Sequence, residues 1–148
     1  MFELIRNQLS RSVPFAGYLG ISVASVDAQA ATARVAEAPH LNNHVGTFHA
    51  GAIFTLCESA AGAALAGALL PVIMQTRFVV RDARVNYLKP AKGTLLAQAA
   101  LVDEAATVLD ELKRLGRADV VVDVSARTHD GQVVAKASFN WSLKQLPA

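Results

Sequence analysis

The strongest constraint on the fold is the stretch from Ala50 to Leu70, which contains a single charged residue, Glu58. Most of its other residues are small, and Pro71 follows directly, where a helix would have to end. The pattern predicts one helix of about 20 residues, roughly 30 Å long at 1.5 Å per residue. Because small side chains on every face let other backbones approach closely, we expect this helix to be enclosed by a curved partner.

The rest of the chain has the strands to form that partner. Val-rich or alternating segments predict six strands, and Asp130-Gly131 between the last two is a strong hairpin signal. The predicted strands span residues 20–26, 30–37, 74–88, 94–102, 119–128 and 132–143. Helices are expected at 2–9 and 103–115, a break at Pro14 and Gly17, and a polar loop at 39–49. The prediction is an α+β fold with five to six antiparallel strands around one helix.

Bulk properties narrow the class of protein. A length of 148 residues fits one domain, residues 1–148. Hydrophobic residues make up 53% and charged residues 18%, which argues against disorder and suggests that another subunit covers apolar surface. A net charge of only +2 argues against nucleic-acid binding.

Three sequence features predict where in the cell the protein is located. The uncharged run 59–76 is dominated by Ala and Gly and contains Pro71, so we expect no membrane span. Charges appear too early in the N-terminal segment for a signal peptide. A single cysteine, Cys57, fits a reducing compartment. The expectation is a soluble cytoplasmic protein.

The beginning of the long helix is a candidate site. The N–H groups of Ala50, Gly51 and Ala52 have no acceptors within the helix and lie at the positive end of its dipole. Such donors can stabilise the oxyanion that forms when a carbonyl is attacked. Asn43 and His49, in the preceding loop, could orient the same carbonyl or a water.

Glu58 adds a carboxylate that could act as nucleophile or as general base on water. It follows Ala50 by eight residues, which is about 12 Å along a helix. One helix therefore cannot easily bring both groups to one carbonyl carbon. We expect the donor and the acid to meet across a subunit boundary, with two equivalent sites in each dimer.

Two motifs resemble a known family. Asn43, Gly46 and His49, with Glu58 nine residues after the histidine, resemble the signature of hot-dog-fold acyl-CoA thioesterases of the 4-hydroxybenzoyl-CoA and phenylacetate-degradation types. The segment YLKPAKG, residues 87–93, is similar to the one that ends a strand in that family.

The resemblance implies a bent antiparallel sheet wrapped around the long helix, in homodimers with a continuous sheet and often in tetramers. It implies hydrolysis of an acyl thioester of coenzyme A or acyl carrier protein, with no separate cofactor because coenzyme A is part of the substrate. Ala50 stands where the family has a Gly that donates to the oxyanion, and Val80 stands where some members have a Ser or Thr that positions water.

A basic band could hold the phosphates of coenzyme A. Between Arg77 and Lys92 lie five basic residues and one acidic residue. Such a cluster on a near-neutral protein suits a compact polyanion. The assigned phosphate-binding residues are Arg81, Arg84, Lys89 and Lys92. The alternative is a solvated strand face.

Structural alternatives remain open for the individual residues. Glu58 could be a structural acid paired with an arginine of the band. His49 could serve only in packing and hydrogen bonding, and Asn43 could stabilise its loop. Cys57 is expected to pack as a small hydrophobe. The spacing of the loop histidines matches no common zinc pattern, so no metal is expected.

Two other functions compete with hydrolysis. One is an acyl-CoA or lipid-binding dimer without turnover, which Val80 favours. The other is a dehydratase-like enzyme of the same fold, but the D-x-N-P-x-H type arrangement of such enzymes is absent from the sequence.

Overall fold

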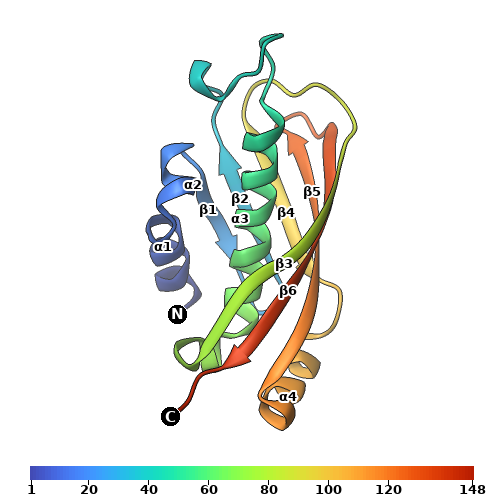
Figure 1. Ribbon diagram of the computed structural model, residues 1–148. Helices are drawn as coiled ribbons and strands as arrows, with labels where there is room; N and C mark the ends of the chain where they lie inside the picture. The colour runs from blue at the N-terminus through green and yellow to red at the C-terminus, as the bar shows by residue number, and fades with distance from the viewer.

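The sheet forms the larger part of the molecule. The computed structural model describes all 148 residues and contains six strands in one antiparallel sheet, in the order β1-β2-β4-β5-β6-β3. The strands are β1 (Ser22–Val26), β2 (Ala30–Val35), β3 (Thr76–Tyr87), β4 (Leu95–Leu101), β5 (Arg117–Thr128) and β6 (Val133–Gln145). They curve around the helix α3 (Ala50–Ala68), as Figure 1 shows. The predicted α+β architecture is confirmed.

Alternating burial explains which face of the sheet meets α3. Along β5, Val120, Val122 and Val124 are buried, whereas Asp119 and Asp123, two of the residues that alternate with them, are exposed. Because successive strand side chains point to opposite faces, the valines face α3 and the acids face outward. The β5–β6 hairpin predicted around Asp130-Gly131 is present.

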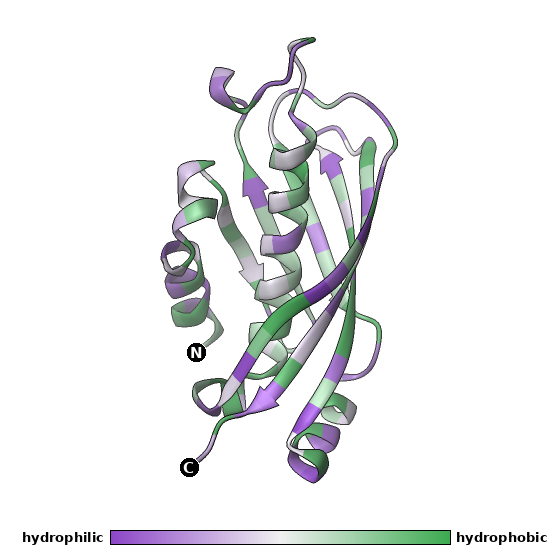
Figure 2. Ribbon diagram, viewed as in Figure 1, coloured by the Kyte–Doolittle hydropathy of each residue, from purple (hydrophilic) through white to green (hydrophobic).

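The central helix is enclosed, as its composition predicts. Of its 19 residues, 13 are buried, and Figure 2 shows mostly apolar colours along it. At Gly67 an added Cβ would collide with the carbonyl oxygen of Asp27 in the β1–β2 turn. The helix is long and apolar enough to cross a membrane by length and composition, but 67% of that window is buried inside the fold. Its apolar character is therefore explained by its position in the core.

The remaining helices lie at the edges. They are α1 (Phe2–Ser12), α2 (Pro14–Tyr18) and α4 (Ala105–Leu115), with 3-10 turns at Pro39–Leu41 and Leu70–Gln75. The predicted break is present at Pro14, because α1 ends at Ser12 and Val13 is extended. At Gly17 the prediction is wrong, because this residue lies inside the short helix that begins at Pro14. Proline is well suited to the first turn of a helix, where its missing N–H would have no acceptor.

The N-terminal helices lie beside β1 and α3 (Figure 1). The Ser10 hydroxyl of α1 donates to the carbonyl oxygen of Arg6 at 3.1 Å and accepts from the N–H of Val23 in β1 at 3.0 Å. This contact fixes α1 against the sheet. Several apolar side chains nearby remain exposed, among them Phe15 and Tyr18.

Strand β3 forms one edge of the sheet. Its register with β6 shifts between Val80 and Asp82, which places Arg81 in a bulge. Ala83 and Tyr87 pair with inward-facing residues of β6, yet both are exposed. The inner face of this edge strand is therefore incompletely covered within one chain.

Candidate active site

His49 shapes the beginning of α3. It is the N-cap residue, and its Nδ1 accepts a hydrogen bond from the N–H of Gly51 at 2.8 Å. The N–H of Ala52 donates to the His49 carbonyl oxygen at 2.9 Å. Ala50 is the first helical residue, and its N–H has no acceptor among the hydrogen bonds of the structure. Of the three donors expected from the sequence, only that of Ala50 is free.

Asn43 holds its own loop together. Its amide nitrogen donates to Thr47 Oγ1 at 2.9 Å and to the carbonyl oxygen of Phe48 at 3.3 Å. Its Oδ1 accepts from the N–H groups of Val45 at 3.0 Å and Thr47 at 3.1 Å. Both amide donors and the oxygen are therefore engaged locally, which supports the loop-stabilising interpretation.

The two sequence motifs lie against one another. The Tyr87 hydroxyl donates to the carbonyl oxygen of Ala50 at 3.2 Å, and the N–H of Phe48 donates to the carbonyl oxygen of Ala91 at 2.9 Å. Burial first, and then the Cys57 charge, raises the pKa of Tyr87, so this hydroxyl stays a donor at neutral pH. The second motif thus positions the start of α3.

Glu58 lies in the middle third of α3 and is half-buried. It lines a cavity of about 250 Å³ whose other walls are mostly apolar. No hydrogen bond or ion pair joins its carboxylate to any residue of the chain. Burial raises the pKa of Glu58 above its ordinary value of 4.5. The alternative of a structural acid paired with an arginine has no support within the chain.

The donor and the acid are not brought together within one chain. Both belong to one continuous helix, so Ala50 and Glu58 are separated by about 12 Å along its axis. His49 and Gly51 line a different cavity, of about 400 Å³. The distance between Ala50 and Glu58 agrees with the sequence-based expectation that one chain cannot bring both groups to the same carbonyl.

Sequence reasoning missed most of the cavity around Glu58. Trp141 of β6 is buried, at 5% exposure, and it lines this cavity together with Phe78 of β3. Gly62 faces the same indole, since an added Cβ would lie 3.2 Å from Trp141 Cη2. In the sequence, the only local indication of this cavity is Gly62 itself, which follows Glu58 by four residues and so lies on the same face of the helix.

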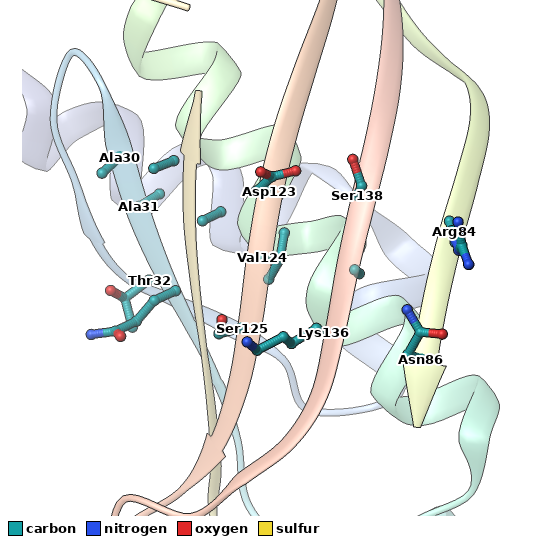
Figure 3. A pocket seen from close by; sticks show the side chains of 14 residues that line it. Ala30, Ala31, Thr32, Arg84, Asn86, Asp123, Val124, Ser125, Lys136 and Ser138 are labelled. Atoms are coloured by element: carbon teal, nitrogen blue, oxygen red, sulfur yellow. The ribbon is translucent and has the colours of Figure 1, made fainter. Parts of the chain in front are cut away.

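The four basic residues assigned to phosphate binding do not form one cluster. Arg81 pairs with Asp119 at 3.0 Å, and both side chains are more than half exposed. Arg84 lines a depression on the face of the sheet turned away from α3, shown in Figure 3. Lys89 lines a cavity of about 320 Å³ together with Ala50, and Lys92 is exposed.

Cys57 is unsuited to nucleophilic chemistry. The residue is fully buried, and burial raises the pKa of its thiol to about 12. The thiolate, which is the reactive form, is therefore scarce at neutral pH. Packing as a small hydrophobe accounts for this residue, as the sequence predicts.

Six antiparallel strands wrapped around one long, buried helix define the hot-dog fold. A protein from Pseudomonas aeruginosa described as a probable thioesterase has the same fold, with a TM-score of 0.80 and 23% identity over 97% of this chain and 95% of its own. A thioesterase from Haemophilus influenzae has a TM-score of 0.77 and 19% identity, covering 100% and 93% of the two chains. The predicted hot-dog fold is confirmed.

The particular family follows from the sequence match. Residues 3–143 match the model of a domain of unknown function, DUF4442, and the chain belongs to this family. A relative from Halobacterium salinarum, named as a candidate esterase, is 32% identical over 129 residues, which cover 82% of this chain and 80% of the relative.

Proposed function

We propose that the protein hydrolyses an acyl thioester of coenzyme A or acyl carrier protein to a carboxylic acid and a free thiol. The proposal rests on the environment of Glu58, the one charged residue of a buried helix. Its carboxylate lines a largely apolar cavity and has no hydrogen-bond or ion-pair partner in the chain. Since an unpaired, half-buried carboxylate is costly, a functional role explains its presence. The esterase and thioesterase names of similar proteins support the same reaction class.

Two routes are open to the Glu58 carboxylate. As a general base it takes a proton from water while the water oxygen attacks the thioester carbonyl, and the C–S bond then breaks to release the thiol. As a nucleophile it attacks the carbonyl itself, which gives an anhydride and the thiol, and water then hydrolyses the anhydride. A raised pKa brings the carboxylate closer to the operating pH and makes it a stronger base.

The oxyanion is assigned to the free N–H of Ala50. Ala50 and Glu58 are about 12 Å apart on one helix. The Ala50 N–H and the Glu58 carboxylate that act on one carbonyl therefore come from two different copies of the chain. A homodimer joined along the incompletely covered edge strand β3, or a pair of such dimers, would contain equivalent sites. His49 and Asn43 then act by holding the helix start and its loop, and the Gly51 N–H joins the site only when His49 turns away.

The phosphates of coenzyme A are assigned first to Lys89. This lysine shares a cavity with Ala50 and Tyr87, next to the proposed oxyanion donor. Lys92 follows three residues later and extends the same positive edge. Arg81 and Arg84 contribute only if the partner or the substrate reaches the outer face of the sheet, where Arg81 is already paired. The protein is expected to need no separate cofactor.

The test is thiol release from a broad panel of acyl-CoA substrates, followed with a chromogenic thiol reagent. Glu58→Gln keeps the shape of the side chain and removes the base, so activity should fall by about 10²–10⁴-fold. Glu104→Gln, at an exposed position without a side-chain hydrogen bond, is the matched control and should retain activity. Full activity in Glu58→Gln, or no thiol release from any acyl-CoA or acyl carrier protein thioester, would refute the proposal.

A binding module without turnover is the second candidate. Val80 pairs with Trp141 on the inner face of the sheet, and its side chain cannot hydrogen-bond a water. Binding of acyl-CoA without thiol release would identify such a module. In that case Val80→Ser, which supplies a hydroxyl at the same place, tests whether water positioning is the missing element.

A further inference from the structure

Two polar groups in the walls of the Glu58 cavity have no partner in the chain. The Glu58 carboxylate accepts no hydrogen bond, and the indole N–H of Trp141 is buried without an acceptor. An ionised carboxylate only accepts hydrogen bonds, and an indole nitrogen only donates them. Burying either group without a partner costs free energy. Each group therefore lacks what the other can provide.

Trp141 has the only free side-chain donor in these walls. The other side-chain donors that line the cavity are three serine hydroxyls. Each already donates to a backbone carbonyl oxygen: Ser10 to Arg6 at 3.1 Å, Ser12 to Leu9 at 3.3 Å and Ser59 to Thr55 at 2.7 Å. No lysine, arginine or histidine lines the cavity. Trp141 is therefore the one wall residue that can donate to Glu58 without breaking an existing bond.

The side of the indole that carries the N–H is turned toward α3. A Cβ added at Gly62 would lie 3.2 Å from Trp141 Cη2 and 3.6 Å from Trp141 Cζ2, with no other ring atom within 4 Å. Cζ2 and Nε1 are bonded to the same ring carbon, so they share one side of the ring. Glu58 lies one turn before Gly62 on the same helical face. Its side chain has three rotatable bonds, through which the carboxylate can turn toward the indole.

The indole itself is fixed in place. Its ring centroid lies 5.9 Å from that of Phe78 at an angle of 53°, and the residue is only 5% exposed. Val80, the cross-strand partner of Trp141 on β3, has no polar side-chain atom and offers no second donor. The N–H is thus a fixed donor, and the carboxylate is the group that has to move.

We propose that the indole N–H of Trp141 donates a hydrogen bond to the ionised Glu58 carboxylate and positions it. Trp141 is then a positioning residue, which acts on a substrate only through Glu58. A hydrogen bond to a charged acceptor stabilises the ionised form and offsets part of the penalty that burial places on it. The bond itself depends on no reaction, whereas its value for catalysis rests on the hydrolysis proposed above.

No other titratable group lines the cavity. The neighbouring thiol of Cys57 stays protonated at neutral pH, because burial raises its pKa to about 12. The remaining charged or titratable residues of the surrounding helices and strands do not line the cavity. They are Glu3, Arg6 and Arg11 of α1, Tyr18 of α2, Arg77, Arg81, Asp82, Arg84 and Tyr87 of β3, and Lys136 and Lys144 of β6. A titration seen at the indole that is lost in Glu58→Gln therefore reports Glu58.

The first measurement follows the indole signal, because Trp141 is the only tryptophan in the chain. In ¹⁵N-labelled wild-type protein, the single indole N–H peak should move downfield in the proton dimension as rising pH ionises Glu58. In Glu58→Gln the side-chain amide oxygen can accept the bond but cannot ionise, so the peak should keep one position. A wild-type peak that stays still or moves upfield, or the same movement in Glu58→Gln, would overturn the proposal.

A second measurement follows the carboxyl group. The ¹³C signal of the Glu58 carboxyl is identified by its absence from Glu58→Gln and is titrated in Trp141→Phe. Loss of the donor should lower the acid ionisation constant of Glu58 about ten-fold or more, the effect of a hydrogen bond to a charged group. If Trp141 only fills space, the smaller ring admits water and the constant stays or rises, which contradicts the proposal.

Phe78→Leu is the matched control for the second measurement. It loosens the same wall and removes no donor, so it should not lower the ionisation constant of Glu58. A fall equal to that in Trp141→Phe would count against the hydrogen bond. Circular dichroism checks that both variants are folded. If Trp141→Phe is unfolded, the titrations of the wild type and Glu58→Gln decide the proposal alone.

These titrations separate the hydrogen bond from the proposed hydrolysis, since they need folded protein and no substrate. A titrating indole supports the bond even if no thiol is ever released. Thiol release from a protein whose indole signal ignores pH retains the hydrolysis and removes the role of Trp141. In active protein, the acidic limb of the kcat/KM profile should shift to higher pH in Trp141→Phe and stay in place in Phe78→Leu.

Discussion

The Tyr87 hydroxyl donates a hydrogen bond to the carbonyl oxygen of Ala50, 3.2 Å away, and so joins the end of β3 to the beginning of α3. The two residues are 37 positions apart in the chain. The bond holds the proposed oxyanion donor against the sheet, because the carbonyl and the free N–H belong to the same residue. A small change in the edge strand can therefore move the helix start.

Tyr87→Phe tests this coupling. Loss of the hydroxyl should lower the free energy of unfolding by about 0.5–1 kcal/mol, the lower part of the range for a hydrogen bond, because Tyr87 is partly exposed. That corresponds to a melting temperature roughly 1–4 °C lower for a chain of this length. Tyr18→Phe, at a residue 81% exposed, is the control and should melt like the wild type. Equal melting of both variants would contradict a structural role for the bond.

The N-cap at His49 gives a second prediction. His49→Ala removes the acceptor of the Gly51 N–H and should destabilise the protein by about 1 kcal/mol in chemical denaturation. His49→Asn replaces the lost acceptor with a preferred capping side chain and should recover most of the difference. Failure of asparagine to recover stability would mean that the imidazole acts through its packing instead.

Gly67 tests the close approach of α3 to the sheet. Gly67→Ala would force the new methyl group against the carbonyl oxygen of Asp27, so unfolding should become easier by about 1–3 kcal/mol. Gly17→Ala places the same methyl group in open space and should change stability little. The comparison uses denaturant midpoints of the two variants. Similar midpoints would show that the β1–β2 turn can move away from the new methyl group at little cost in free energy.

Glu58→Gln should raise stability at neutral pH while it removes activity. Burial raises the pKa of Glu58, so the folded state favours the protonated acid. Stability from this shift is fully present below the unfolded value of 4.5 and is lost as pH rises through the higher folded value. The variant and the wild type should therefore melt alike at acid pH, and the variant should melt higher at neutral pH. A pH-independent difference would contradict the assigned cause.

Cys57 should be unreactive in the folded protein. Its thiol is fully buried with a pKa of about 12, so an aromatic disulfide reagent should not modify it under native conditions at neutral pH. In guanidinium chloride one thiol per chain should react. Rapid native modification would show that this part of α3 opens readily.

Much of the fold could be predicted from local patterns. The small residues of α3, the alternation along β5 and the Asp130-Gly131 turn each reflect the conformation of the segment that contains them. The short helix at Pro14 was missed, because Pro and Gly within four residues are typical of both a break and a helix beginning.

The sequence by itself determined that a buried helix with a single acid would be surrounded by antiparallel strands, since periodicity and side-chain size act within each segment. It also determined that Ala50 and Glu58 are too far apart to act on one carbonyl within one copy. The tertiary structure decided what surrounds Glu58: residues of α1, α2, β1, β3 and β6, Trp141 among them. Those contacts depend on sheet curvature and on strand register, where a shift of one residue turns every side chain to the opposite face. The bulge at Arg81 is such a shift, and no local pattern in β3 specifies it.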